Sequence, residues 1–162
     1  MAMTSYLKVE GKNQGSIEGD CPQKGHEKWI LVYGLEWSME IPRDTHSGLP
    51  TGQRIHNPIT IAKKLDPASP LIAQACASGE QMKKWQLDFH QISDKGAEEL
   101  YYTIQLENAI VVDIRYEKLL TFLEANKPYH DMEYVSFTYE KITWSNKKAN
   151  KEAIDDWKAP KA

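Results

Sequence analysis

The sequence predicts a mainly β protein, an antiparallel β-barrel or sandwich of two sheets with one short α-helix alongside. About seven or eight segments alternate apolar with polar side chains, which is the period of a strand with one buried face. The chain of 162 residues is long enough to bury a core without a metal or disulfide. We therefore expect a single domain over residues 1–162, with the barrel at about residues 6–144 and a polar C-terminal tail at residues 145–162.

The first half of the chain contains three predicted strands. Residues 6–10 alternate two apolar side chains with polar neighbours. In residues 29–41 every odd position is apolar, and the even positions become polar from Gly34 onward. This pattern predicts one long strand, bent at Gly34, whose first half is covered on both faces. Residues 59–62 predict the third strand.

One segment has the pattern of a helix. Ser69 suits the N-cap, Pro70 stands where its missing N–H costs nothing, and Gly79 suits the residue that ends the helix. An apolar stripe predicts that the helix packs on a sheet. The stripe consists of Leu71, Ile72, Ala75 and Cys76.

The second half is again rich in strands. Two alternating segments, residues 84–90 and 100–106, flank a hairpin-type turn at residues 94–96. A further strand follows the turn at Glu107 and Asn108. Its predicted apolar face consists of Ile110, Val112 and Ile114.

The last predicted strand, from residue 135 to 144, changes its apolar parity near Glu140. A bulge or bend there explains the change, because a slip of one residue moves every later side chain to the other face. Before this strand, residues 119–123 contain four large apolar side chains at helix-like spacing. We expect this segment to cap the core, and an exposed partner surface is the alternative.

Residues 43–58 form a long polar connection. Gly48, Pro50, Gly52 and Pro58 exclude a helix or a central strand. A connection of this length in a compact domain is usually functional or disordered. Its two arginines and two histidines favour a functional loop over a linker.

Composition excludes several classes of function. The net charge is −3 with both signs interspersed, so there is no basic face for nucleic acid. The two cysteines, Cys21 and Cys76, are expected to be free thiols. The N-terminus lacks the pattern of a cleavable signal, and no apolar run reaches membrane-spanning length. We expect a cytoplasmic protein, or one exported without a cleavable signal.

The residues show no pattern of an active site, a metal site or a cofactor site. The five histidines lack the spacing of metal ligands, and no nucleophile elbow is present. The sequence therefore favours an interaction protein over an enzyme. Two alternatives stay open: a small-molecule-binding β-barrel with Trp29, Trp37 and Trp85 around a cavity, and a hydrolase that uses the loop histidines with Asp44.

Six short strings carry a resemblance to a known family. In chain order they are IPRD (41–44), HSGLPTGQRIHNP (46–58), SPL (69–71), LENAIVVDI (106–114), YEKITW (139–144) and DDW (155–157). Each string is weak alone, but their order and spacing over residues 6–160 are specific. The chain resembles Hcp, the haemolysin-coregulated tube protein of bacterial type VI secretion.

The resemblance implies a two-sheet β-barrel that forms homo-hexameric rings. The rings stack into a hollow tube, which a contractile sheath expels with a spike protein at its tip, and effector cargo travels inside the ring. Export then needs no cleavable signal peptide, and no enzyme activity or cofactor is implied.

The resemblance also implies which residues make contacts. The loop that touches neighbouring subunits or the next ring contains Arg43, Asp44, His46, Ser47, Gly48, Pro50, Thr51, Gly52, Arg54, His56 and Pro58. At the C-terminus, Asp155, Asp156 and Trp157 are candidate contacts to the sheath or to a neighbouring subunit.

Overall fold

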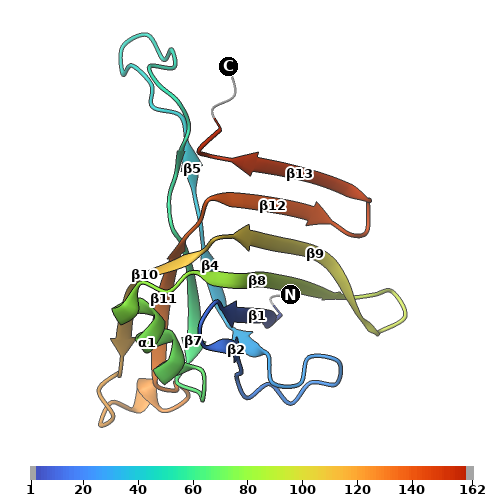
Figure 1. Ribbon diagram of the computed structural model, residues 1–162. Helices are drawn as coiled ribbons and strands as arrows, with labels where there is room; N and C mark the ends of the chain where they lie inside the picture. The colour runs from blue at the N-terminus through green and yellow to red at the C-terminus, as the bar shows by residue number, and fades with distance from the viewer. Residues whose placement is uncertain (1–2, 160–162) are drawn as a thin grey trace.

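The computed structural model describes residues 3–159, which fold into two antiparallel sheets with one α-helix beside them (Figure 1). The mainly β fold predicted from the sequence is confirmed. Within the described residues the two sheets do not close into a single barrel by strand pairing, so the sandwich form of the prediction is the one observed.

Seven strands form the larger sheet, in the order β13-β12-β9-β8-β1-β2, with β3 also paired to β1. They are β1 (Ser5–Gly11), β2 (Gly15–Ile17), β3 (Ile30–Val32), β8 (Met82–Ile92), β9 (Glu98–Glu107), β12 (Lys141–Asn146) and β13 (Lys151–Asp156).

Four strands form the second sheet, in the order β10-β11-β7-β4. They are β4 (Gly34–Glu36), β7 (Ile59–Lys64), β10 (Ile110–Glu117) and β11 (Met132–Thr138). A separate two-stranded ribbon joins β5 (Met39–Glu40) to β6 (Ile55–His56). The helices are α1 (Ser69–Ser78) and the short 3-10 helix η1 (Glu124–Asn126).

The core lies between the two sheets. Trp85 of β8 and Phe137 of β11 meet edge to face, with ring centres 5.6 Å apart, and both are almost completely buried. Aromatic pairs of this geometry stabilise a core beyond the area that they bury. Ile72 and Ala75 of α1 are buried in the same cluster, as the predicted stripe requires, while Leu71 is partly exposed.

The N-cap of the helix lies one residue before Ser69, the N-cap that the sequence predicts. Ala68 holds the N-cap position, and its N–H donates to the Asp66 carboxylate at 3.0 Å. The Ser69 hydroxyl instead contacts the buried ammonium group of Lys63 at 3.0 Å. The end of the helix is confirmed, since Gly79 adopts a left-handed conformation with φ of 67°.

The long strand predicted over residues 29–41 is wrong, although its bend at Gly34 is confirmed. The segment contributes β3 to the larger sheet, β4 to the second sheet and β5 to the ribbon. The Tyr33 N–H donates to the carbonyl of Ala62 at 2.8 Å, where the chain changes sheets. The parity change near Glu140 has the same cause, because the chain passes there from β11 to β12.

Two predicted faces are also wrong. In β10 the pairing shifts between Val111 and Asp113, so Val111 is buried and Val112 is exposed. Residues 119–123 do not cap the core, since Leu120, Phe122 and Leu123 are all exposed.

The polar tail predicted at residues 145–162 contains an ordered strand. Residues 151–156 form β13, which pairs with β12 along its whole length. Four of these six residues stay exposed at the edge of the sheet, so the sequence carries no alternating apolar signal. Residues 160–162 of the predicted tail lie outside the described residues.

A cluster of rings holds the loop after β2 against the larger sheet. His26 stacks on Tyr6 with ring centres 4.2 Å apart and meets the ring of His90 at 4.8 Å. The His26 Nε2 atom lies 4.0 Å from the Asp88 carboxylate, and Tyr6 donates a hydrogen bond of 2.8 Å to Glu98. Burial lowers the pKa of His90, and the electrostatic interaction with the neighbouring His26 ring lowers it further.

We expect the protein to lose stability as the pH falls below about 6.5, the ordinary pKa of histidine. The lowered pKa means that the unfolded chain binds a proton on His90 before the folded chain does. The stabilising contribution is therefore complete above the unfolded value and is lost as the pH falls through the folded one. Urea unfolding at several pH values measures the slope of the free energy of unfolding against pH, and His90→Gln should make that slope smaller.

His46→Gln is the matched control, because His46 is exposed on the projecting loop. It should leave the slope unchanged. A slope in His90→Gln as steep as in the parent protein would contradict the assignment to His90.

Among residues 3–159, no helix has the length and apolar character needed to cross a membrane. Cys21 and Cys76 are both free thiols, as predicted.

Candidate functional site

The loop predicted to be functional projects far beyond the two sheets (Figure 1). The ribbon of β5 and β6 forms its stem, with Met39 paired to His56 and Glu40 paired to Ile55. Below the stem, Asn57 donates from its backbone N–H to the carbonyl of Ser38 at 3.1 Å. The loop is thus a continuation of sheet structure and has a defined direction.

The tip of the loop is held by its own hydrogen bonds. The Asp44 carboxylate accepts from the backbone N–H groups of Ser47, at 2.7 Å, and His46, at 2.9 Å. These bonds lower the pKa of Asp44. Gly48 then turns with a left-handed φ of 73°, and its N–H donates to the Asp44 carbonyl at 2.9 Å. The tip therefore presents its side chains from a fixed backbone.

A charged group at the root of the loop ties it to the C-terminal strand. The Arg54 Nε donates to the Oδ2 of Asp155 at 2.5 Å, and its Nη2 donates to the backbone carbonyl of Asp156 at 2.7 Å. The His56 Nε2 lies 2.7 Å from the same Asp155 oxygen. We call Arg54, His56 and Asp155 the root clamp. It joins residues about a hundred positions apart in the chain, such as Arg54 and Asp155.

A chain of hydrogen bonds continues from the root clamp into the protein. The indole N–H of Trp37 donates to the Tyr139 hydroxyl at 2.8 Å, and that hydroxyl lies 2.8 Å from the Nδ1 of His56. An indole nitrogen can only donate, so the Tyr139 proton is directed to Nδ1 and the His56 Nε2–H is directed to Asp155. In this arrangement the indole N–H, the hydroxyl group, both imidazole nitrogens and the carboxylate each have a hydrogen-bond partner.

Two pKa shifts accompany this arrangement. The hydrogen bond from Arg54 lowers the pKa of Asp155, and the His56 contact lowers it further, so the carboxylate stays charged at neutral pH. Burial raises the pKa of Tyr139 to about 12, which keeps the hydroxyl protonated. Because the Tyr139 oxygen is buried and already accepts a hydrogen bond from Trp37, the geometry is that of a structural support.

Most of the predicted contact residues fall into two groups. Arg54, His56 and Asp155 face one another inside the protein, where they fix the loop. The ring of Trp157 lies 5.8 Å from that of His56 and is partly exposed. The residues exposed on the projecting part are Arg43, His46, Ser47, Gly48, Pro50, Thr51 and Gly52, with Pro58 exposed below the stem.

Sequence reasoning missed two members of this site, Trp37 and Tyr139. Tyr139 lies where the chain leaves β11, next to the predicted bend at Glu140. That break in the apolar pattern was the available signal. Sequence reasoning also missed Leu49, which is exposed at the tip of the loop.

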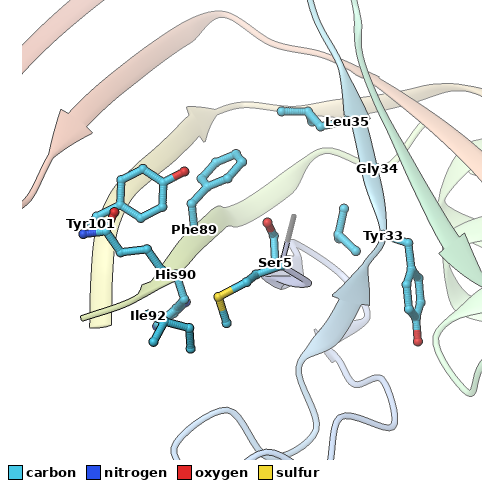
Figure 2. A pocket seen from close by; sticks show the side chains of 11 residues that line it. Ser5, Tyr33, Gly34, Leu35, Phe89, His90, Ile92 and Tyr101 are labelled. Carbon is cyan, nitrogen blue, oxygen red and sulfur yellow. The ribbon is translucent and has the colours of Figure 1, made fainter. Parts of the chain in front are cut away.

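A cavity lies away from the loop, between β1, β4 and β8 (Figure 2). It is an open slot of about 550 Å³, and Phe89, His90 and Tyr101 line one side of it. The tryptophans proposed to surround a ligand do not line it, because Trp85 is buried in the core and Trp37 joins the chain of hydrogen bonds at the loop root. The alternative of a ligand cavity among Trp29, Trp37 and Trp85 is not supported by this arrangement.

Known proteins match this chain over most or all of its length. The family model described as "Type VI secretion system effector, Hcp" matches residues 6–145. The sequence is 39% identical over 171 aligned residues to the major exported protein of Pseudomonas aeruginosa, covering 100% of this chain and 99% of that protein.

Solved structures agree with the sequence match. Hcp1 of Escherichia coli EAEC 042 has a TM-score of 0.86 at 31% identity, with 96% of this chain and 99% of that chain covered. The secreted protein Hcp3 of Pseudomonas aeruginosa has a TM-score of 0.79 at 33% identity, with 98% and 100% covered.

The two-sheet fold and its matches to the family model and to solved structures thus define a protein of the bacterial type VI secretion system. The chain belongs to the Hcp family. The resemblance noted from the six sequence strings is confirmed.

Proposed function

We propose that this protein is a structural subunit of the type VI secretion tube. It forms hexameric rings that stack into a hollow tube, and effectors travel in the lumen. The tube assembles in the cytoplasm, a contractile sheath expels it, and a spike protein leads it out of the cell. The protein acts by assembly, with no catalytic step of its own.

The observation that carries the proposal is the projecting loop. A loop that extends away from the sheets cannot gain stability from the core, yet its tip and its root are both fixed by hydrogen bonds. Fixing such a loop in advance lowers the entropy cost of binding a partner. A ring also needs one surface patch to meet a different patch on the next copy, and a projecting element supplies such a patch.

Purified protein should form hexameric rings in negative-stain electron microscopy and elute as a hexamer in size-exclusion chromatography with light scattering. A monodisperse monomer at high concentration would count strongly against a tube subunit. Co-purification of the rings with candidate effectors then tests the carrier role.

The two glycines of the loop tip should behave differently. Gly48 has a left-handed φ of 73°, where a β-branched residue is strained, typically by about 1–3 kcal/mol. Gly48→Val should therefore distort the tip and shorten stacked tubes. Since the tip lies outside the core, the thermal midpoint of the subunit should change little. Tube length by electron microscopy and thermal unfolding measure the two effects.

Gly52→Val is the matched control. A Cβ at Gly52 would lie 3.8 Å from the Pro42 Cγ, an ordinary contact, and its backbone is not left-handed. It should assemble like the parent protein. Equal loss of folding and stacking in Gly48→Val would mean that this glycine supports the fold of the subunit instead.

A further inference from the structure

A cleft of about 490 Å³ lies on the second sheet, beside the connection between β10 and β11. Figure 1 shows this connection, residues 118–131, at the end of the molecule opposite the projecting loop. Pockets that hold small molecules have volumes of about 300–1,000 Å³, so the cleft has a suitable size. We call it the basal cleft, and its apolar lining includes Tyr33, Leu119, Tyr129, Met132 and Tyr134.

The walls of the basal cleft are held in place by backbone and ionic contacts. Tyr33 lies where the chain passes from the larger sheet to the second sheet, and its N–H is bonded across to β7. On the other side, Tyr129 belongs to the connection, whose ends are joined by the ion pair of Lys118 with Asp131 at 2.9 Å. The Leu65 N–H donates to the Asp131 carbonyl at 3.1 Å. A site formed in advance costs less ordering when it binds a ligand.

One cation of the basal cleft has no charged partner. Lys64 is half-buried in β7, and its ammonium group lies 5.9 Å from the centre of the Tyr33 ring. Carboxylates close to it in the chain belong to other pairs, because Asp66 and Glu133 contact Lys63. Within residues 3–159, the Lys64 ammonium group makes no ion pair.

The carboxylate in the lining of the cleft does have a partner. Glu117 lies 3.3 Å from the Arg115 guanidinium group and 3.5 Å from the Tyr134 hydroxyl. The same guanidinium group lies 4.2 Å from the centre of the Tyr134 ring. Glu117 and Arg115 therefore balance each other, and the charge of Lys64 remains available to a ligand.

We propose that the basal cleft binds a small organic acid, with an aromatic body between the rings of Tyr33 and Tyr129 and a carboxylate paired with Lys64. Aromatic rings stabilise such a body through offset or edge-to-face contacts. A neutral molecule of the same shape leaves the Lys64 charge unpaired, and an organic cation is repelled by it. The site takes no part in ring formation, so this inference goes beyond the proposed function and does not depend on it.

Three probes of nearly the same shape test the charge preference. The full-length protein is titrated in a calorimeter with naphthoate, with the neutral naphthamide and with the cationic naphthylmethylamine. Naphthoate should bind at one site per chain, about tenfold more tightly than naphthamide, and naphthylmethylamine should bind most weakly. Added salt should reduce the preference for the acid, because it screens a charge at the protein surface.

Lys64→Met should lower the affinity for naphthoate about tenfold and leave that for naphthamide unchanged, because the apolar stem is kept. Lys127→Met is the matched control. It removes the same charge at the same end of the molecule, but Lys127 pairs with Glu124 and does not line the cleft. His130→Gln, which alters another polar group of the lining, should also keep the preference for the acid.

Tyr129→Ala should lower the affinity for naphthoate and naphthamide by the same factor, about fivefold, because it removes a wall and no charge. Tyr116→Ala is its control, since Tyr116 is an exposed tyrosine of β10 outside the cleft. Thermal unfolding of each variant checks that the subunit is folded.

The following results would overturn the proposal. Equal binding of the three probes, or naphthoate binding that Lys64→Met leaves unchanged, would exclude an acid site at Lys64. An equal effect of Lys127→Met would attribute the preference to the general field of the protein. A peptide that ends in a free phenylalanine carboxylate, if it bound through Lys64 at least tenfold more tightly than naphthoate, would assign the cleft to a protein C-terminus instead. A failure of the protein to form rings would leave this inference standing, so the two proposals are tested separately.

Discussion

Asp155→Ala should release the projecting loop from the C-terminal strand and abolish the stacking of rings. The carboxylate is buried and accepts from Arg54 at 2.5 Å, with His56 Nε2 at 2.7 Å from the same oxygen. Its removal leaves a guanidinium group and an imidazole without their partner. A hydrogen bond to a charged group contributes about 1.5–3 kcal/mol, and Arg54 keeps its bond to the Asp156 carbonyl, so we expect a loss of stability of about 2–3 kcal/mol. Thermal unfolding and electron microscopy of the rings measure the two parts.

The adjacent residue provides the control. Asp156 contributes its backbone carbonyl to Arg54, and Asp156→Ala keeps that carbonyl. Its side chain accepts from the N–H of Lys158 at 3.0 Å, near the end of the described chain. Asp156→Ala should therefore retain stacking and nearly all of the stability. If the two variants behaved alike, the root clamp would not be the element that directs the loop.

Low pH should weaken the same contacts of Asp155 with Arg54 and His56. Because the folded protein lowers the pKa of Asp155, the stability from this carboxylate is complete above its unfolded value of about 3.9 and is lost as the pH falls through the folded value. Asp155→Ala should be less sensitive than the parent protein in this acidic range. The histidine effect described above occurs at higher pH, so the two can be measured separately.

The elements that were predicted correctly are those whose local sequence indicates which side chains are buried or where the element begins and ends. Residues 59–62 alternate buried and half-buried side chains as the sequence predicts, and they lie in β7. The helix was marked by Pro70 and Gly79, whose backbone restrictions are local. Such signals need no knowledge of the partner strand.

The errors have a physical reason in common: the deciding interaction is distant in sequence. Residues 29–41 keep one alternation while their hydrogen bonds pass from β1 to β7 and then to β6, so the pattern does not show the change of sheet. β13 is an edge strand held by the backbone of β12, and its exposed side chains resemble a loose tail. Backbone pairing leaves little trace in side-chain chemistry.

The functional loop could be found from its own residues, but its support could not. Arg54 and Asp155 each look like an ordinary surface charge in the sequence, because nothing local to either one indicates burial. The resemblance to Hcp identified both segments and treated both as contacts to other molecules. The structure pairs them with each other, which leaves the exposed tip as the part of the loop that can reach a partner.

Lys63→Met should be the most destabilising of these substitutions. Lys63 is fully buried in β7, and its ammonium group contacts Glu133, the Asp66 carboxylate at 2.8 Å and the Ser69 hydroxyl at 3.0 Å. The group links the second sheet to the start of α1. Removing the cation leaves two buried carboxylates without their partner, and breaking a buried ion pair in this way costs about 3–5 kcal/mol. Urea and thermal unfolding measure the loss.

Two further variants separate the loss of charge pairing from the loss of packing. Lys118→Met breaks the exposed pair with Asp131, and pairs of that kind contribute at most about 1 kcal/mol. Combining Lys63→Met with Glu133→Met removes the most buried carboxylate along with the cation, and should recover much of the stability, since apolar replacements of a buried pair are often neutral or stabilising. If the double variant were as unstable as Lys63→Met alone, the lysine would act through its packing and through Asp66. Recovery would show that the unpaired charge of Glu133 is the main cost, and that this ion pair selects one docking position for α1 without being the chief source of its stability.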